Sequence, residues 1–189
     1  MNEKEFTISI FTENRVGILN HITIVLTRRQ LNIESVTTSE SAVEGVQLIN
    51  LVVKTTYEKV RKVAKQIEKI IEVIKVFVNS SNDVISREIA LFKLSAKVIL
   101  SNDVVDLIMK THNAKFIEIN SEFMVVEKVG SVDEIKKLFC ALKPFGILQF
   151  ARSGRVAVTR QVKEFQDYLS EVDSAFNCKE YKNATVELL

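Results

Sequence analysis

Hydrophobic residues recur at every second position in some stretches of the N-terminal part and at every third or fourth position in others. The first period is typical of a half-buried strand, and the second of an amphipathic helix. Residues 5–12 have the strand period, and a helical period follows from Gly17 to about Leu31. A hairpin of two strands should follow, over residues 32–39 and 46–54. A second helix, opened by a capping box, is expected over residues 55–74, and a last strand over residues 73–79. The predicted order is βαββαβ.

A polar, turn-rich stretch at residues 79–83 is followed by the same predicted order of elements. Ser101 and Ser131 are the expected N-caps of its two helices, the second in a capping box with Glu134, and Pro144 should stop that helix. The expected elements are a strand, a helix, a hairpin, a helix and a strand, over residues 88–98, 101–111, 114–120 and 123–129, 131–143, and 147–151. The sequence thus predicts an α+β fold of two consecutive domains, residues 1–80 and 81–160, followed by a helical or mobile tail over residues 161–189.

Composition supports two modest domains and argues against several classes of partner. The chain has 189 residues, of which 47% are hydrophobic, which is enough for two small cores. Its formal net charge is only +2, so no strong positive field favours the binding of nucleic acid. The acidic N-terminus lacks the pattern of a secretory signal, and no hydrophobic run is long enough to span a membrane. Cys140 and Cys178 have no metal-like or redox spacing. We expect a cytoplasmic protein with both thiols reduced.

Residues suited to catalysis are scarce. The two histidines, His21 and His112, have no ligand-spaced carboxylate or cysteine, so no metal site is predicted. No nucleophile elbow, P-loop or dinucleotide-binding motif occurs, and five glycines in the whole chain leave little for a phosphate cradle. We therefore predict no catalytic residue and no cofactor of this chain's own.

One segment, residues 11–19, has two interpretations. In the first, a strand turns directly into a helix, with Asn14 as the cap and Gly17 tolerated early in the helix. In the second, the free N–H groups and the positive dipole end of that helix bind a carboxylate, and Gly17 lets the ligand approach the backbone. Asn14 can donate and accept, so it would suit the polar ends of an amino acid. The residues alone leave both interpretations open.

Residues 13–19, Glu-Asn-Arg-Val-Gly-Ile-Leu, together with 31–35, Leu-Asn-Ile-Glu-Ser, resemble the ACT domain of the small regulatory subunit of acetohydroxyacid synthase, also called acetolactate synthase. Residues 87–93 and 150–157 are similar to the opening and closing strands of that family's C-terminal domain. The resemblance covers about residues 4–160. It implies two consecutive βαββαβ ferredoxin-like domains, the first an ACT domain.

This resemblance also implies a function. The family's members activate a large subunit, which is expected to hold thiamine diphosphate, Mg and FAD, and confer feedback inhibition by valine in valine, leucine and isoleucine synthesis. Two ACT domains pair as a homodimer, with the effector between the helix-start loop of one and the second strand of the other. Carried over to this chain, the effector-binding residues are Asn14, Val16, Gly17, Ile18, Asn32 and Ile33.

The chain departs from the family pattern at Arg29-Gln30-Leu31, where a glycine usually serves the end of the helix. Two other function classes stay open at this stage. One is an ACT-type amino-acid-sensing module of another enzyme or of a transcriptional regulator, although no helix-turn-helix segment is evident. The other is a small ferredoxin-like enzyme, which would need a reactive constellation that the sequence does not show.

Overall fold

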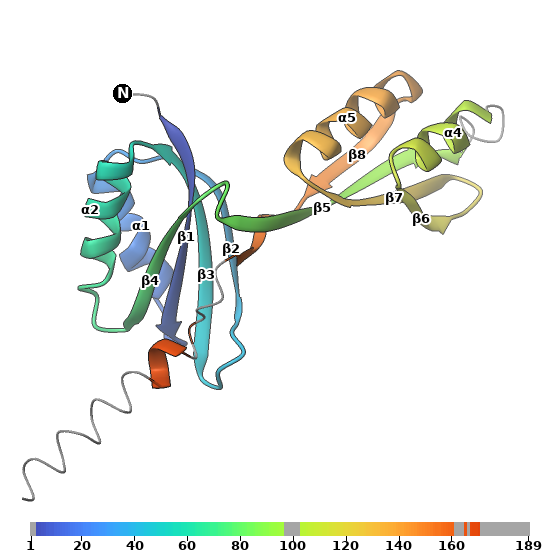
Figure 1. Ribbon diagram of the computed structural model, residues 1–189. Coiled ribbons are helices and arrows are strands. Elements are labelled where there is room, and N and C mark those ends of the chain that lie inside the picture. Colours follow the sequence, from blue (N-terminus) through green and yellow to red (C-terminus); the bar gives the residue numbers. More distant parts are fainter. Residues whose placement is uncertain (1–2, 97–102, 161–164, 166, 171–189) are drawn as a thin grey trace, which may run out of the picture. The chain divides into compact units, whose positions relative to one another are not determined.

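The computed structural model describes residues 3–96, 103–160, 165 and 167–170 (Figure 1). Residues up to Val158 form one compact unit, and the described residues beyond it belong to a second. Within the described ranges, no helix is long and apolar enough to cross a bilayer. Most of the predicted tail, residues 161–189, lies outside these ranges, as do Ser101 and Cys178.

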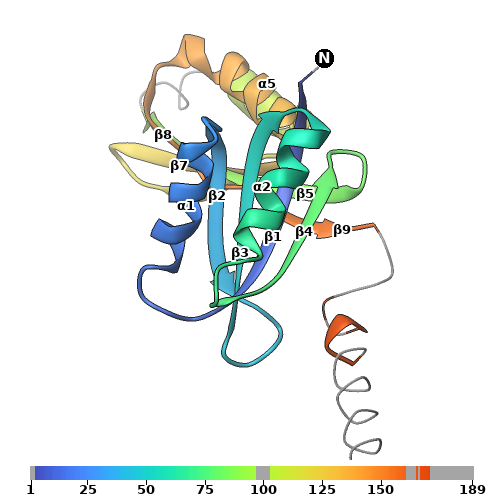
Figure 2. The same cartoon turned by 90° about the vertical axis from the view of Figure 1, so that its left-hand side faces the viewer.

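The first half contains a four-stranded antiparallel sheet with helices on one face (Figures 1 and 2). Its elements are β1 Lys4–Glu13, α1 Ile18–Arg28, β2 Ile33–Glu40, β3 Val46–Thr55, α2 Tyr57–Ile67 and β4 Val73–Ser80. The strand order is β2-β3-β1-β4. The alternating aliphatic residues of β1 and β3 pack under α1 and α2 in one core, which includes Ile8, Ile10, Ile22, Leu26, Ile49, Leu51, Val60 and Val63.

The second half repeats this arrangement. Its elements are β5 Val84–Ser95, α4 Asp103–Thr111, β6 Lys115–Ile119, β7 Phe123–Gly130, α5 Val132–Leu142, the 3-10 turn η1 Lys143–Phe145, β8 Ile147–Arg152 and β9 Val156–Thr159. The sheet order β6-β7-β5-β8 corresponds strand by strand to that of the first half, and β9 adds a short pairing with β5. A separate core surrounds Phe92, whose ring packs against Phe139 and Phe150. The predicted α+β class of two consecutive ferredoxin-like domains is confirmed.

Several predicted boundaries were wrong. Helix α2 ends at Ile67, although the hydrophobic spacing predicted a helix as far as Ile74. The reason is that Ile70 packs on the core from a turn, and the β-branched residues after it form β4. The second domain's first strand begins at Val84, well before the predicted residue 88. Strand β9 was not predicted.

The N-caps of α2 and α5 can be compared with the two predicted capping boxes. Thr56, and not Thr55, is the N-cap of α2, because Thr55 is the buried last residue of β3. The predicted box at Ser131 is confirmed: the Ser131 hydroxyl accepts from the Glu134 amide at 3.3 Å, and the Glu134 carboxylate accepts from the Ser131 amide at 2.7 Å. Hydrogen bonding of the Glu134 carboxylate to the Ser131 backbone, and second to the Ser131 side chain, lowers the pKa of Glu134.

Helix α1 ends in a Schellman motif although it lacks the expected glycine. Gln30 takes the left-handed conformation at φ 52, and the amides of Gln30 and Leu31 donate to Thr27 and Leu26 at 2.9 and 3.1 Å. Leu31 is buried against the first core, which completes the motif. The chain therefore enters β2 through a common type of helix end, although the positive φ of Gln30 costs more free energy than it would cost a glycine.

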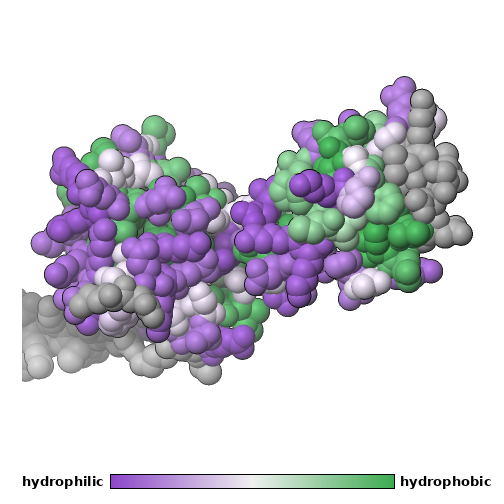
Figure 3. Space-filling model, turned by 90° about the horizontal axis from the view of Figure 1, so that it is seen from above, coloured by the Kyte–Doolittle hydropathy of each residue, from purple (hydrophilic) through white to green (hydrophobic). Residues whose placement is uncertain are grey.

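Large hydrophobic side chains lie exposed mainly on the second domain. Figure 3 shows them as green surface, whereas the first domain presents mostly purple polar groups. The exposed residues include Ile89, Leu91, Val104, Leu107, Ile117, Ile119, Val129 and Leu148. Such a surface is typical of protein contact.

Candidate functional site

The helix-start loop, residues 14–17, joins β1 to α1 without any side-chain cap. Gly17 is the N-cap, and its φ of 90 places it in the left-handed region that favours glycine. The interpretation with Asn14 as the cap was therefore wrong, because helix α1 starts four residues further on. Asn14 is exposed, and its side chain stays available for other partners.

Backbone donors are open at this helix start. The Ile18 amide reaches the Arg15 carbonyl only at 3.4 Å, and the His21 amide makes the first helical bond, to Gly17, at 3.1 Å. Within the described residues, the amides of Leu19 and Asn20 have no acceptor. Nothing lies within 4 Å of the position a Cβ would take on Gly17. The loop thus combines free N–H groups, the positive end of the helix dipole and room for a ligand.

The loop is held in place from two sides. The Glu13 amide donates to the Glu72 carbonyl at 2.9 Å, which ties the loop to the turn before β4. The Arg15 side chain pairs with the Glu13 carboxylate at 2.8 Å, and the Arg15 amide donates to the Glu13 carbonyl at 3.0 Å. These contacts fix the direction in which the open amides point.

The aliphatic residues of the predicted site divide into two groups. Val16 is fully exposed, and no part of the chain that the structure describes covers it. Ile18 is buried in the first core, and Ile33 is half-buried against it. Only Val16 is free to give an apolar contact to a ligand, while the side chain of Ile18 anchors the helix.

The two asparagines of the predicted site are far apart within one chain. Asn14 follows Glu13, which pairs with Val46 at the start of β3, whereas Asn32 precedes Ile33, which pairs with Val53 near its end. Seven residues of extended strand at about 3.4 Å each separate these levels by about 24 Å. The structure does not bring the two halves of the predicted site together within a single protomer.

A metal or catalytic centre is not apparent in the described residues. No group of three histidine, cysteine or acidic residues there is placed to hold a metal ion. His21 is exposed on α1, and Cys140 is an exposed free thiol. A basic hollow of about 390 Å³ near the end of α1 is lined by Arg28, Arg29 and other residues, but by none of the six predicted site residues.

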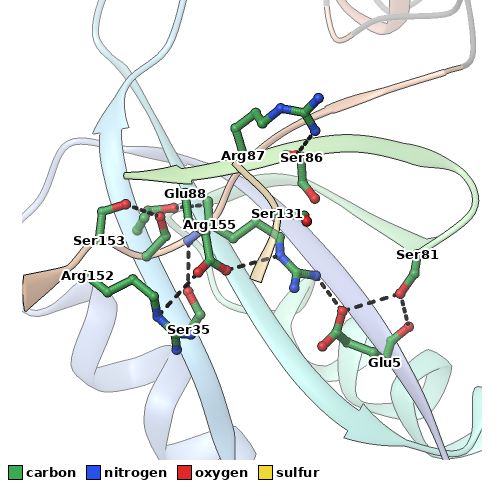
Figure 4. A network of polar contacts seen from close by, with 12 residues as sticks. Glu5, Ser35, Ser81, Ser86, Arg87, Glu88, Ser131, Arg152, Ser153 and Arg155 are labelled. Atoms are coloured by element: carbon green, nitrogen blue, oxygen red, sulfur yellow. Dashed lines mark hydrogen bonds and ion pairs between the residues drawn. The ribbon is translucent and has the colours of Figure 1, made fainter. Parts of the chain in front are cut away.

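Sequence analysis missed a buried polar cluster around Arg155. This arginine is 8% exposed and lies close to the carboxylates of Glu5 and Glu88 (Figure 4). Its motif, Ser153-Gly154-Arg155, contributed to the family resemblance, but no pattern in the sequence indicates that the arginine is buried.

Comparison with known proteins identifies the family. Residues 87–161 match the family model described as the small subunit of acetolactate synthase, and residues 8–75 match that of the AHAS small subunit-like ACT domain. The acetolactate synthase small subunit of Bacillus subtilis is 32% identical over 158 residues, which cover 83% of this chain and 91% of that protein. The chain belongs to the acetolactate synthase small subunit family.

Other members of the acetolactate synthase small subunit family are similar to this chain over most of its length. The protein from Mycobacterium leprae is 30% identical over 154 residues, covering 82% of this chain and 90% of its own length. The crystal structure of the acetolactate synthase small subunit from Thermotoga maritima superimposes with a TM-score of 0.76 over 85% of this chain and 99% of that one. At 24% identity, this second likeness shows the shared fold.

Proposed function

We propose that this chain activates the large subunit of acetolactate synthase and makes it sensitive to feedback inhibition by valine. The observation that carries the proposal is the match of both halves to the two family models of that small subunit. In this proposal, residues 1–80 are the effector-binding ACT domain and residues 81–160 are the C-terminal domain. The chemistry, with its thiamine diphosphate, Mg and FAD, belongs to the large subunit.

The proposed effector site lies between two copies of the chain. One copy supplies the helix-start loop with Asn14, and its partner supplies the start of β2 with Asn32. A separation of about 24 Å within one chain supports this arrangement, because a single amino acid cannot reach both asparagines there. The homodimer follows from the same reasoning, since each pocket needs two chains.

The loop's chemistry suits an aliphatic amino acid. The open amides of Leu19 and Asn20 would receive the carboxylate at the positive end of α1. Asn14 and Asn32 offer amide groups to the ammonium, and the exposed Val16 offers an apolar contact to the isopropyl group. Valine fits this combination, because it has one charged end and a short branched side chain.

Reconstitution tests the proposed function directly. The purified chain alone should form no acetolactate from pyruvate, and adding it to the large subunit should raise the rate and make it sensitive to valine. Acetolactate formed by the chain without any large subunit would contradict the proposed role. A large subunit whose rate and valine sensitivity do not change on mixing would also contradict it.

A mixing experiment tests the shared pocket. Asn14→Ala and Asn32→Ala each remove one hydrogen-bonding side chain, which costs about 1–3 kcal/mol or roughly a 5- to 150-fold loss of affinity. In a mixed dimer, one pocket carries both lesions and the other carries none. About half the sites of the mixed dimers should therefore regain normal affinity by calorimetry. If proven subunit exchange restores no tight sites, the pocket is not shared.

A further inference from the structure

The return segment, residues 153–155, leaves the second domain's β8 and lies against β2 of the first domain. The Arg155 amide donates to the Ser35 hydroxyl at 2.9 Å, and the Thr37 hydroxyl donates to the Arg155 carbonyl at 2.9 Å. On its other side, the segment stays bound to β5: the Ser153 amide donates to the Ile89 carbonyl at 2.8 Å, and the Ile89 amide donates to the Ser153 hydroxyl at 2.9 Å. The segment therefore links β2 to the central strand of the second sheet.

Gly154 makes this contact close as well as polar. A Cβ on Gly154 would stand 2.5 Å from the Thr37 methyl carbon and 2.6 Å from the Val36 carbonyl oxygen. Because one of these atoms belongs to the backbone of β2, a side chain would have to push the strand away. The two chain segments touch so closely that a displacement of β2 must move the return segment too.

The Arg155 side chain extends the link into both domains. Its Nη1 lies 2.6 Å from the Glu5 carboxylate on β1, and its Nε lies 3.7 Å from the Glu88 carboxylate on β5 (Figure 4). Glu88 is 5% exposed, and Arg152 Nε approaches its other oxygen at 3.3 Å, without the alignment of a hydrogen bond. Removing the Arg155 guanidinium would take the arginine from Glu5 and leave the buried Glu88 with Arg152 as its ion-pair partner, so the cluster favours the arrangement with both contacts in place.

Strand β2 connects this link to the proposed effector site. Asn32 and Ile33 stand at its beginning, and the hydroxyls of Ser35 and Thr37 follow on the same strand. The pairing of β2 with β3 shifts between Ile33 and Ser35, directly before the first of the two hydroxyls. An effector that repositions the start of β2 would therefore act first on the two hydroxyls bound to Arg155.

We propose that the return segment transmits effector binding from β2 to the second domain, and that Arg155 is the positioning residue for this coupling. This inference rests on the proposed valine-binding function. Arg155 is held by Ser35 and Thr37 through its main chain and by Glu5 and Glu88 through its side chain, and with these contacts in place the two domains respond together. Without them, valine would still bind but its signal would not reach the second domain. The coupling free energy between valine and the large subunit is then carried by this contact.

The test measures valine affinity by calorimetry for the full chain, alone and with the large subunit, together with valine inhibition of acetolactate formation. Coupling between two sites typically changes affinity by about 5- to 150-fold, so the wild-type ratio of the two affinities should fall in that range. Arg155→Met removes the side-chain contacts to Glu5 and Glu88 and keeps the main-chain bonds to β2. It should bind valine alone like the wild type, but its ratio should fall clearly below the wild-type ratio and its inhibition should weaken. Thr37→Val, which loses only the hydroxyl, should lower the ratio part of the way.

Arg87→Met is the matched control, because Arg87 is exposed and its guanidinium bonds to the neighbouring Ser86 carbonyl. It should keep the wild-type ratio. A folded Arg155→Met chain with the same ratio and inhibition as Arg87→Met would overturn the inference and leave the proposed function intact. If Arg155→Met does not fold, an unchanged ratio in Thr37→Val has the same meaning. A wild-type chain that binds no valine would overturn the proposed function, and this inference with it.

Discussion

Replacing Gly17 with aspartate should weaken valine binding while leaving the chain folded. Nothing lies within 4 Å of the added Cβ, so the new side chain meets solvent. The cost is in the backbone, because φ is 90 there and a left-handed conformation costs a residue with a side chain about 1–2 kcal/mol. A carboxylate at the helix start recovers about 0.3–1 kcal/mol of this through the dipole. The free energy of unfolding should therefore fall only slightly.

The effect on valine is larger, because the new carboxylate competes for the amides of Leu19 and Asn20. Two negative charges about 4 Å apart repel by about 1 kcal/mol in water and by about 4 kcal/mol at an effective dielectric constant of about 20. These limits correspond to a loss of affinity between about 5-fold and about 900-fold. The partly open loop places the expected value between them.

Calorimetry on Gly17→Asp and Gly17→Asn separates charge from shape. Asparagine has nearly the same size and the same tolerance of positive φ, but it carries no charge. Valine affinity should fall much further in the aspartate variant than in the asparagine variant. Equal losses would refute the electrostatic reasoning, and a folded aspartate variant with wild-type affinity would refute the site itself.

Further predictions concern the helix ends. Gln30→Gly should raise the free energy of unfolding by roughly 1 kcal/mol, because glycine accepts the positive φ at C′; an unchanged or lower urea midpoint would contradict this. Ser131→Ala should cost about 1 kcal/mol and more than Thr56→Ala, since only Ser131 belongs to a reciprocal box. Because folding lowers the pKa of Glu134, its contribution to stability is present above the ordinary value of 4.5 and is lost as the pH falls through the lowered value. Glu134→Gln should abolish that part of the pH dependence, and carboxyl NMR titration that finds an ordinary pKa in the wild type would contradict the prediction.

The accuracy of the sequence predictions depended on how far apart the interacting residues are. The box of Ser131 and Glu134 was found because both partners lie within one helical turn. The end of α2 was missed because Ile70 and Ile74 continue the helical period, although Ile70 packs on the core from a turn and Ile74 lies in β4. Local spacing cannot separate these outcomes, since burial depends on the neighbouring sheet.

The candidate site was likewise predictable only in part. Gly17 was recognised as a special position, but its role as an N-cap with positive φ, instead of Asn14 as the cap, depends on where β1 ends. The burial of Arg155 has no local signal, because its partners Glu5 and Glu88 are distant in sequence. Charged residues of this kind look like any surface arginine until the fold closes over them.

The crowding at Gly154 bears on how mutational tolerance in this family should be interpreted. A scan of all substitutions would find Gly154 as intolerant as a ligand-binding residue, because a side chain there would meet the Val36 carbonyl, which cannot move without its strand. Gly130 offers a contrast: a Cβ there would first meet side-chain atoms of Glu134 and Lys128, and the nearest is the Glu134 carboxylate oxygen that accepts from the Ser131 amide. Substitution of the two glycines would therefore report different things, one a fixed distance between two chain segments and the other the packing of a capping box.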